Sequence, residues 1–179
     1  MNRRAFGVPV LFGFALLLTG CYGSVSSRIP TVPVGASEDI KMCEQDAASR
    51  GSPRQKRSEE KRIVYAACMI ARGYESYVAI PLRLEGKRIA PIGYGGVPMM
   101  VRATTPHSQD TVVGDLQSCV EETLVVLRPE VVAKASELRG SGAAGFEASG
   151  LPMKVSSAFG ACLEPRQYQT RPWERPARR

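Results

Sequence analysis

Apolar side chains recur every three to four residues in several stretches of the chain, which is the spacing of an amphipathic helix. In the clearest example, Val113, Leu116 and Val120 are followed by Leu124 and Leu127. Glycine and proline mark the expected ends of these helices. The pattern predicts helices over residues 37–50, 52–72 and 154–163, and two more, from about residue 110 and from 129 to 138, that Pro129 separates.

Between residues 77 and 105 the pattern changes to short apolar runs that prolines and glycines interrupt. Such runs are typical of strands and loops. Glu85-Gly86 is placed to turn a small hairpin, and the prolines confine any strands to sheet edges or short pieces. The glycine-rich run 140–145 follows no predicted strand and precedes no lysine, so we interpret it as flexible linkage and not as a phosphate-binding loop.

The first 21 residues differ from the rest of the chain. Arg3 and Arg4 precede an apolar run, Val8 to Leu18, which is too short to cross a bilayer as a helix. The run ends in Leu18-Thr19-Gly20-Cys21. A positive start, an apolar segment and small residues before a cysteine resemble the signal peptide of bacterial lipoproteins, whose lipobox reads approximately L-[AST]-[GA]-C.

The resemblance implies that residues 1–20 are removed and that Cys21 is acylated on its thiol and its new amine, which anchors the protein in a membrane. Tyr22 stands where an aspartate would retain a lipoprotein in the inner membrane of many Gram-negative bacteria. The resemblance therefore implies the periplasmic face of the outer membrane. We expect residues 21–36 to form the lipidated N-terminus and a flexible tether.

Charge adds little to this picture. Removing residues 1–20, whose only charged side chains are Arg3 and Arg4, lowers the formal net charge from +7 to +5. We expect residues 37–165 to form a single helical domain and residues 166–179 to be an unfolded basic tail. The tail is either a solvated end or a contact for lipopolysaccharide, anionic lipid or wall polymer, and the expected location excludes nucleic acid. Its arginines are Arg171, Arg175, Arg178 and Arg179.

Besides Cys21, four cysteines remain in a compartment that oxidises thiols. An even number there predicts two disulfides, although spacing alone leaves three possible pairings. A four-cysteine zinc site is the alternative, but the cysteines do not form closely spaced pairs, and we expect no metal or other cofactor. The four are Cys43, Cys68, Cys119 and Cys162.

Two alignments within the chain indicate an internal duplication, and they favour one of the three possible disulfide pairings. Residues 39–46 align with 115–122, and residues 65–76 align with 159–170, with the cysteines at equal offsets. The second alignment keeps an alanine, a cysteine, an arginine and a tyrosine identical. The predicted fold is therefore mostly α, with two disulfide-stapled helical hairpins. The copies are 37–76 and 110–170, the strand and loop segment between them is 77–109, and the disulfides are Cys43–Cys68 and Cys119–Cys162.

The duplication also retains an arginine and a tyrosine after the second cysteine of each copy. These pairs are Arg72 with Tyr74 and Arg166 with Tyr168. In a structural role, the arginine contacts carbonyls at a helix C-terminus and the tyrosine ring covers the disulfide. In a binding role, each pair offers a guanidinium and an aromatic face to an anionic sugar or a lipid headgroup. We favour the structural role.

Candidate catalytic residues are few. His107 is the single histidine and lies in a predicted loop, so no histidine-dependent nucleophilic site is indicated. Glu75-Ser76, after a helix, resembles the glutamate and serine pair of lytic transglycosylases, in which the glutamate is the general acid. The downstream Gly-Leu-Met-Gln element of that family is missing, and the second copy has Gln169-Thr170.

The sequence thus predicts a lipid-anchored protein of the cell envelope with a structural or binding role and no enzymatic activity. The expected partners are the membrane, through Cys21, and peptidoglycan, lipopolysaccharide or an envelope protein. The alternative is a peptidoglycan-acting enzyme or accessory subunit with Glu75 as general acid.

Overall fold

The structure, a computed structural model, describes residues 36–50, 57–84, 87–88, 96–138 and 142–174. Most of these residues are in helices. The expected predominance of helix is therefore confirmed. The helices are α1 (Ala36–Ser49), α2 (Arg57–Ala71), α3 (Gln109–Leu138), α4 (Gly142–Ala148) and α5 (Leu151–Leu163), with a short 3-10 helix, η1 (Glu164–Arg166), after α5. The strands are β1 (Ser76–Ile80), β2 (Arg83–Leu84), β3 (Lys87–Arg88), β4 (Val97–Ala103) and β5 (Tyr168–Pro172).

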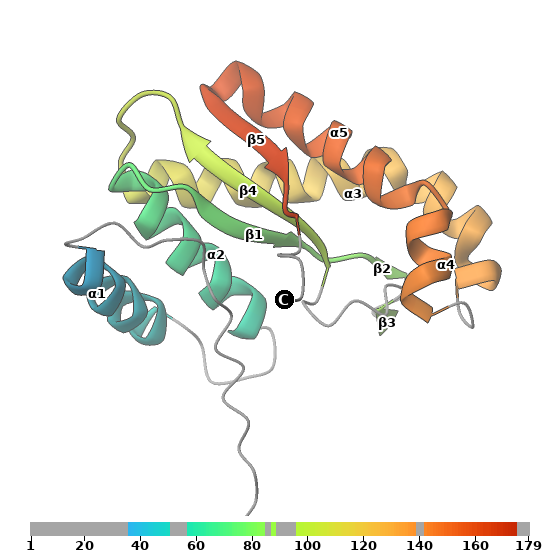
Figure 1. Cartoon of the computed structure of the whole chain (residues 1–179), viewed down its shortest axis with the longest axis horizontal. Helices are drawn as coiled ribbons and strands as arrows, with labels where there is room; N and C mark the ends of the chain where they lie inside the picture. Colours follow the sequence, from blue (N-terminus) through green and yellow to red (C-terminus); the bar gives the residue numbers. More distant parts are fainter. Residues whose placement is uncertain (1–35, 51–56, 85–86, 89–95, 139–141, 175–179) are drawn as a thin grey trace, which may run out of the picture. The chain divides into compact units, whose positions relative to one another are not determined.

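Three of the strands form an antiparallel sheet in the order β1-β4-β5, with β4 in the centre (Figure 1). Val78 pairs with Met99 between β1 and β4, and Val101 pairs with Thr170 between β4 and β5. Since both outer strands are antiparallel to β4, β1 and β5 run in the same direction. The short strands β2 and β3 pair separately, around the expected hairpin turn at Glu85-Gly86, which lies outside the described residues.

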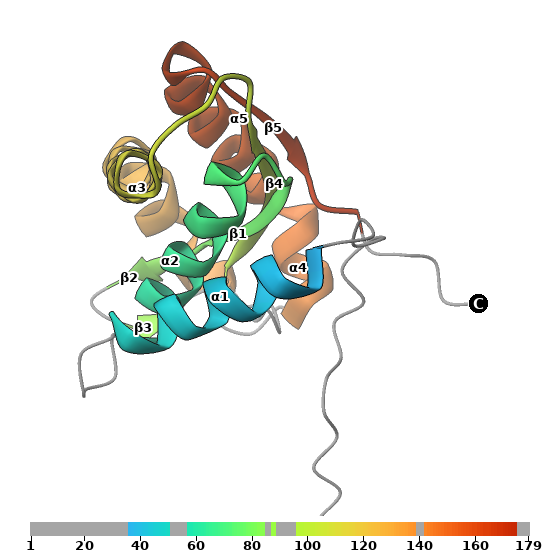
Figure 2. The same ribbon diagram turned by 90° about the vertical axis from the view of Figure 1, so that its left-hand side faces the viewer.

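Helices α2 and α5 flank the sheet and share α3 as a neighbour. Helix α2 contacts β1, α5 contacts β5, and α3 packs against both helices. Helix α1 packs against α2 (Figure 2). Each outer strand of the sheet thus packs against the α-helix that precedes it along the chain, with η1 between α5 and β5.

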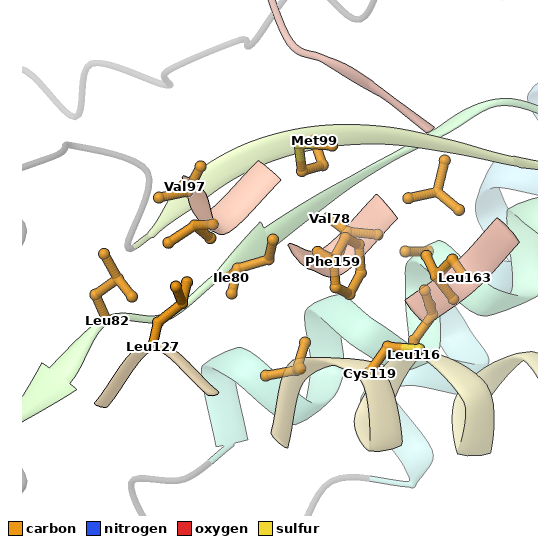
Figure 3. Packing of buried hydrophobic residues seen from close by; sticks show 14 of the residues in the cluster. Val78, Ile80, Leu82, Val97, Met99, Leu116, Cys119, Leu127, Phe159 and Leu163 are labelled. Atoms are coloured by element: carbon orange, nitrogen blue, oxygen red, sulfur yellow. The ribbon is translucent and has the colours of Figure 1, made fainter. Parts of the chain in front are cut away.

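The main core lies between the sheet and these helices. Figure 3 shows side chains of β1 and β4 directed toward those of α3 and α5, with Phe159 among them. Phe159 and Leu116 are fully buried. Burial of such side chains contributes about 1.5 to 3 kcal/mol each, so this cluster dominates the stability of the fold. Other members are Val78, Ile80, Val97, Met99, Leu127 and Leu163.

Helices α1 and α2 follow the prediction closely. Helix α1 begins one residue before the expected Ser37 and ends one residue before Arg50, and α2 ends at Ala71 instead of Arg72. The expected start of the second helix at residues 52–55 lies outside the described residues. Gly73 follows α2 with φ of 86°, a left-handed conformation that glycine adopts without steric cost.

The predicted break at Pro129 is wrong. Helix α3 continues through this residue to Leu138. Proline removes one backbone hydrogen bond, but Leu127, Val131 and Leu138 are all buried on the core side of the helix. Their burial outweighs the local cost, so packing and not backbone preference decides the helix length.

Two further expectations near the C-terminal helices are corrected. Residues 142–145 of the expected flexible linkage belong to α4, because Phe146 of this helix is fully buried in the core and holds the segment in place. Helix α5 begins at Leu151 and not at Lys154. Leu151 is also buried, and Pro152 occupies the first turn, where its missing N–H costs no hydrogen bond.

The expectation of an unfolded tail from residue 166 onward is wrong for residues 168–172, which form β5 and pair with β4. Tyr168 is only 3% exposed and anchors this strand in the core. The proline rule for strands also fails for β4, a central strand that contains Pro98 as its second residue. The carbonyl of Pro98 still accepts a hydrogen bond from the backbone of Trp173. Arg175, Arg178 and Arg179 lie outside the described residues.

Candidate functional site

The four cysteines form two disulfides, each between two helices. Cys43 of α1 joins Cys68 of α2, and Cys119 of α3 joins Cys162 of α5. The Cα atoms are 5.5 Å apart in the first and 5.6 Å apart in the second, within the ordinary range for disulfides. These are the two pairs that the sequence alignments favoured.

A polar cluster surrounds the first disulfide. Asp39 lies one helical turn before Cys43 and accepts two hydrogen bonds on different oxygens. The guanidinium of Arg72 donates one at 2.9 Å, and the hydroxyl of Tyr74 donates the other at 2.8 Å. Tyr74 also packs against the buried cluster that contains the disulfide. The left-handed turn at Gly73 brings both side chains to the same carboxylate.

The second disulfide has a cluster with the same order of groups. Asp115 lies one turn before Cys119, and the hydroxyl of Tyr168 donates a 2.8 Å hydrogen bond to it. The Nε atom of Arg166 is 3.6 Å from the other carboxylate oxygen. Between this arginine and tyrosine, Gln167 has φ of 67°, the same left-handed turn as in the first cluster.

Both tyrosines are held in their neutral form. The hydrogen bond to Asp39 is the main reason why the pKa of Tyr74 rises above its ordinary value. For Tyr168 burial is the larger cause, and the hydrogen bond to Asp115 raises the pKa further. Ionisation of either hydroxyl would remove a donated hydrogen bond and place a second negative charge beside the carboxylate.

The two arginines differ in what they contact besides the aspartate. Arg166 donates hydrogen bonds to the carbonyl of Cys162 and to the Sγ atoms of both cysteines of its disulfide. It also forms an ion pair with Glu122 at 3.0 Å. Glu122 has a lowered pKa, first because Ser118 donates a hydrogen bond to it and then because of Arg166.

The predicted binding residues therefore direct their polar groups into the fold. Arg72 and Tyr74 bind the carboxylate of Asp39 in α1, and Arg166 and Tyr168 contact that of Asp115 in α3. An anionic ligand would have to compete with these carboxylates for the guanidinium groups. Sequence reasoning missed the acidic partners, although each stands four residues before its cysteine and was conserved between the aligned segments.

Glu75 does not lie with these clusters. Both of its carboxylate oxygens accept hydrogen bonds from Arg171 of β5, at 2.7 and 2.6 Å. The pair crosses the outer face of the sheet and ties β5 to the residue before β1. Glu75 thus contacts a residue that the sequence placed in an unfolded tail.

His107 lies in the connection before α3, as expected, and its ring stacks on Tyr168. The ring centroids are 4.9 Å apart, with 16° between the planes. Its Nε2 atom is 3.1 Å from the hydroxyl of Thr105. The histidine therefore covers the second polar cluster, a packing role that the sequence did not indicate.

A further set of polar residues joins α1 to the start of α3. Asp46 accepts hydrogen bonds from Arg50 and Gln109, and Arg50 also forms a 2.8 Å ion pair with Asp110. The hydrogen bond from Gln109 is the main cause of the lowered pKa of Asp46. Sequence reasoning missed this set, because nothing in the pattern indicates which helices are neighbours.

Cys21 lies outside the described residues. Among the residues that the structure does describe, no three His, Cys, Asp or Glu side chains are grouped so that they could hold a metal ion. Within the same ranges, no helix has the length and apolar character needed to cross a membrane. Comparisons with protein-family models, curated proteins and solved structures found no match for this chain.

Proposed function

We propose that this protein is a lipid-anchored component of the bacterial cell envelope, held on the outer membrane through Cys21, with a structural or binding role. The observation that carries the proposal is the lipobox-like sequence Leu18 to Cys21 at the end of a short apolar segment. The two disulfides support it, because disulfides persist in oxidising compartments such as the periplasm.

We further propose that the fold arose by duplication of a unit that runs helix, helix, left-handed turn, strand. The two polar clusters support this origin. In both, the aspartate, the two disulfide cysteines, the arginine and the tyrosine occur in the same order. The spacing from the aspartate to the first cysteine, and from the second cysteine to the tyrosine, is the same in the two clusters. In both, an outer strand of the same sheet begins at or just after the tyrosine: β5 begins at Tyr168, and β1 begins two residues after Tyr74. The helix α4 is an addition to the second unit.

Processing and lipidation test the anchor. The Cys21→Ala variant, produced in a Gram-negative host, should accumulate as an unprocessed precursor or as a soluble form, while the parent protein partitions with the membrane fraction. Fractionation and immunoblotting measure this distribution. Cys68→Ala is a control that removes a cysteine without changing the lipobox. Unchanged membrane retention of the Cys21→Ala variant would contradict the anchor.

For the binding role we propose the outer face of the sheet as the contact surface, with anionic peptidoglycan as the partner. In β4, Arg102 alternates with the buried Val101 and therefore points away from the core. Its side chain is exposed, and Arg171, opposite Met100 on the same face, is exposed as well. Glu75 neutralises Arg171, so Arg102 leaves this face with an excess positive charge.

Aromatic side chains extend this face. Tyr77 lies opposite Met100 on the other side of β4, and its ring meets that of Trp173 edge to face, with centroids 6.1 Å apart. Positive charge beside aromatic rings is suited to a glycan that bears carboxylates. Arg72 and Arg166 are not part of the proposed surface, because their guanidinium groups already bind carboxylates of the fold.

Sedimentation with purified sacculi tests this surface. The oxidised chain from Tyr22 to Arg179 should pellet with sacculi in a saturable and salt-sensitive manner, and Arg102→Gln should weaken binding about two- to fivefold, as expected for one exposed charge. Arg128→Gln is the matched control, since it removes an exposed arginine from α3. Equal binding by Arg102→Gln and the parent chain would contradict the proposed surface.

We do not extend the proposal to catalysis by Glu75. A general acid must present a proton to the leaving group, whereas both oxygens of Glu75 accept hydrogen bonds from Arg171. The same sedimentation assay addresses this alternative, because release of muropeptides that Glu75→Gln abolishes would indicate an enzyme.

A further inference from the structure

The two disulfides differ in their electrostatic surroundings. In the second, one guanidinium nitrogen of Arg166 donates to the Sγ of Cys119 at 2.8 Å and also to the Sγ of Cys162. The equivalent arginine of the first cluster, Arg72, binds Asp39. Among the described residues no side-chain hydrogen bond reaches the Sγ of Cys43 or Cys68. The first disulfide, whose sulfurs accept no hydrogen bond from a described arginine, thus serves as a control for the effect of Arg166 on the second.

The two disulfides also differ in access. Cys43 is 0% exposed and Cys68 is 2% exposed, so the first disulfide is buried on both sides. In the second, Cys119 is 0% exposed but Cys162 is only partly buried. Of the four disulfide cysteines, Cys162 is therefore the one with appreciable exposure to solvent, and it is the one that a thiolate can approach most easily without prior unfolding.

We propose that Cys119–Cys162 is an exchange-reactive disulfide, opened at Cys162 by a dithiol reductant, and that Cys43–Cys68 is purely structural. This inference is independent of the lipid anchor and of the sheet surface. The proposed partner of the second disulfide is a dithiol, either a small molecule or a protein, which does not react with the first disulfide.

The exchange proceeds in two balanced steps. A thiolate of the reductant attacks the Sγ of Cys162, which forms a mixed disulfide and breaks the bond to Cys119. The electron pair leaves on Cys119 as a thiolate, next to the guanidinium of Arg166 that already donates to this sulfur. The second thiol of the reductant, as its thiolate, then attacks the reductant sulfur of the mixed disulfide, and the Cys162 thiolate that leaves takes up a proton. The reductant is oxidised to its own disulfide, and both cysteines are reduced.

Arg166 accelerates the first step because a charge-assisted hydrogen bond stabilises the leaving thiolate, and a leaving group of lower pKa departs faster. Glu122 acts in the opposite direction. Its carboxylate is ionised, pairs with Arg166 and lies 3.2 Å from the Sγ of Cys162, where it repels an approaching thiolate. The reactivity of the disulfide is thus set by two side chains of opposite charge, and each can be removed alone.

Graded reduction of the oxidised full chain by dithiothreitol tests the proposal, with acid quenching, alkylation and mass mapping of the four cysteines. Cys119 and Cys162 should become alkylated at least about tenfold faster than Cys43 and Cys68. Arg166→Gln should slow their reduction about tenfold, whereas the matched Arg72→Gln should leave it unchanged. Circular dichroism establishes that each variant is folded.

Glu122→Gln is the second variant, and it keeps the test valid if Arg166→Gln does not fold. Glu122→Gln should accelerate reduction of Cys119–Cys162. Asp46→Asn is the matched control, because Asp46 follows Cys43 at the same spacing, and it should not accelerate reduction of this disulfide. Equal reduction rates for the two disulfides would overturn the proposal. So would an unchanged or faster rate in folded Arg166→Gln, because the guanidinium would then not promote the exchange.

Discussion

Asp39 and Asp115 are the residues on which each polar cluster depends. Each accepts a hydrogen bond from a tyrosine hydroxyl and faces the arginine two positions before that tyrosine. The surroundings differ, because Tyr74 is partly buried whereas Tyr168 is only 3% exposed and stacks on His107. A buried hydroxyl without a partner costs more than an exposed one, so the second cluster contributes more to stability.

The two aspartates can be compared directly. Asp115→Ala leaves the buried hydroxyl of Tyr168 without its acceptor, and we expect it to lower the free energy of unfolding by about 1 to 3 kcal/mol. Asp39→Ala is the matched variant and should cost less, because water can reach Tyr74. Urea unfolding under non-reducing conditions measures both. A larger loss for Asp39→Ala would contradict the importance of burial at Tyr168.

Tyr168 should also make the fold sensitive to alkali. Burial and Asp115 raise its pKa in the folded chain, so in the unfolded chain the hydroxyl ionises first, near the ordinary value of about 10. The stabilisation is therefore complete below this pH and decreases above it, by up to about 1.4 kcal/mol per pH unit.

Tyr168→Phe removes the ionisable group and should flatten the pH dependence above about pH 10. The quantity to compare is the slope of unfolding free energy against pH, because the lost hydrogen bond shifts the whole curve equally. A Tyr168→Phe variant with the slope of the parent chain would show that this hydroxyl is not the group responsible.

At the scale of elements, α3 shows how packing overrides a local break. Its buried residues continue on both sides of Pro129, and the helix tolerates the proline within it. Pro129 itself is exposed and contributes little packing. The helix therefore retains the cost of a proline without a compensating contact at that side chain.

Pro129→Ala should consequently stabilise the protein. Alanine restores the backbone N–H and relieves the clash with the preceding turn, and we expect the free energy of unfolding to rise by about 1 to 3 kcal/mol. Gly114→Ala, in the same helix with open space at the added Cβ, is a reference for an ordinary gain in helix propensity, about 1 kcal/mol. A destabilised Pro129→Ala variant would mean that the proline shapes a bend the fold requires.

The elements predicted well were those set by local sequence. Helices α1 and α2 carry a clear apolar stripe and a glycine stop, and their bounds agree with the prediction within one residue where the structure describes them. Strand β5 could not be predicted, because Tyr168 to Pro172 is short and polar and ends in a proline. Its strand conformation comes from pairing with β4 more than sixty residues earlier in the chain.

The polar clusters were predicted in part. The alignment found Arg72, Tyr74, Arg166 and Tyr168 and favoured a structural role. It gave no partners, because hydrogen bonds from Tyr168 to Asp115 and from Arg171 to Glu75 join residues that are 53 and 96 positions apart. Nothing in the sequence pattern singles out Glu122, and only its place beside Arg166 indicates a role.

At the scale of the whole molecule, the two disulfides of the fold agree with the location proposed from the lipobox-like sequence Leu18 to Cys21. Closing loops of 25 and 43 residues stabilises the fold by about 3 to 4 kcal/mol each in the chain-entropy model. Such stabilisation is retained only where thiols are oxidised, which is the environment that a lipidated Cys21 would give the domain.

The most direct test of this account is the intact mass of the protein extracted from membranes of a Gram-negative host. The account predicts a mature chain that begins at Cys21, carries a diacylglyceryl group on its thiol and an acyl chain on its amine, and lacks four further hydrogens because both disulfides are formed. A chain that still contains residues 1–20, or a soluble chain with an unmodified Cys21, would contradict it.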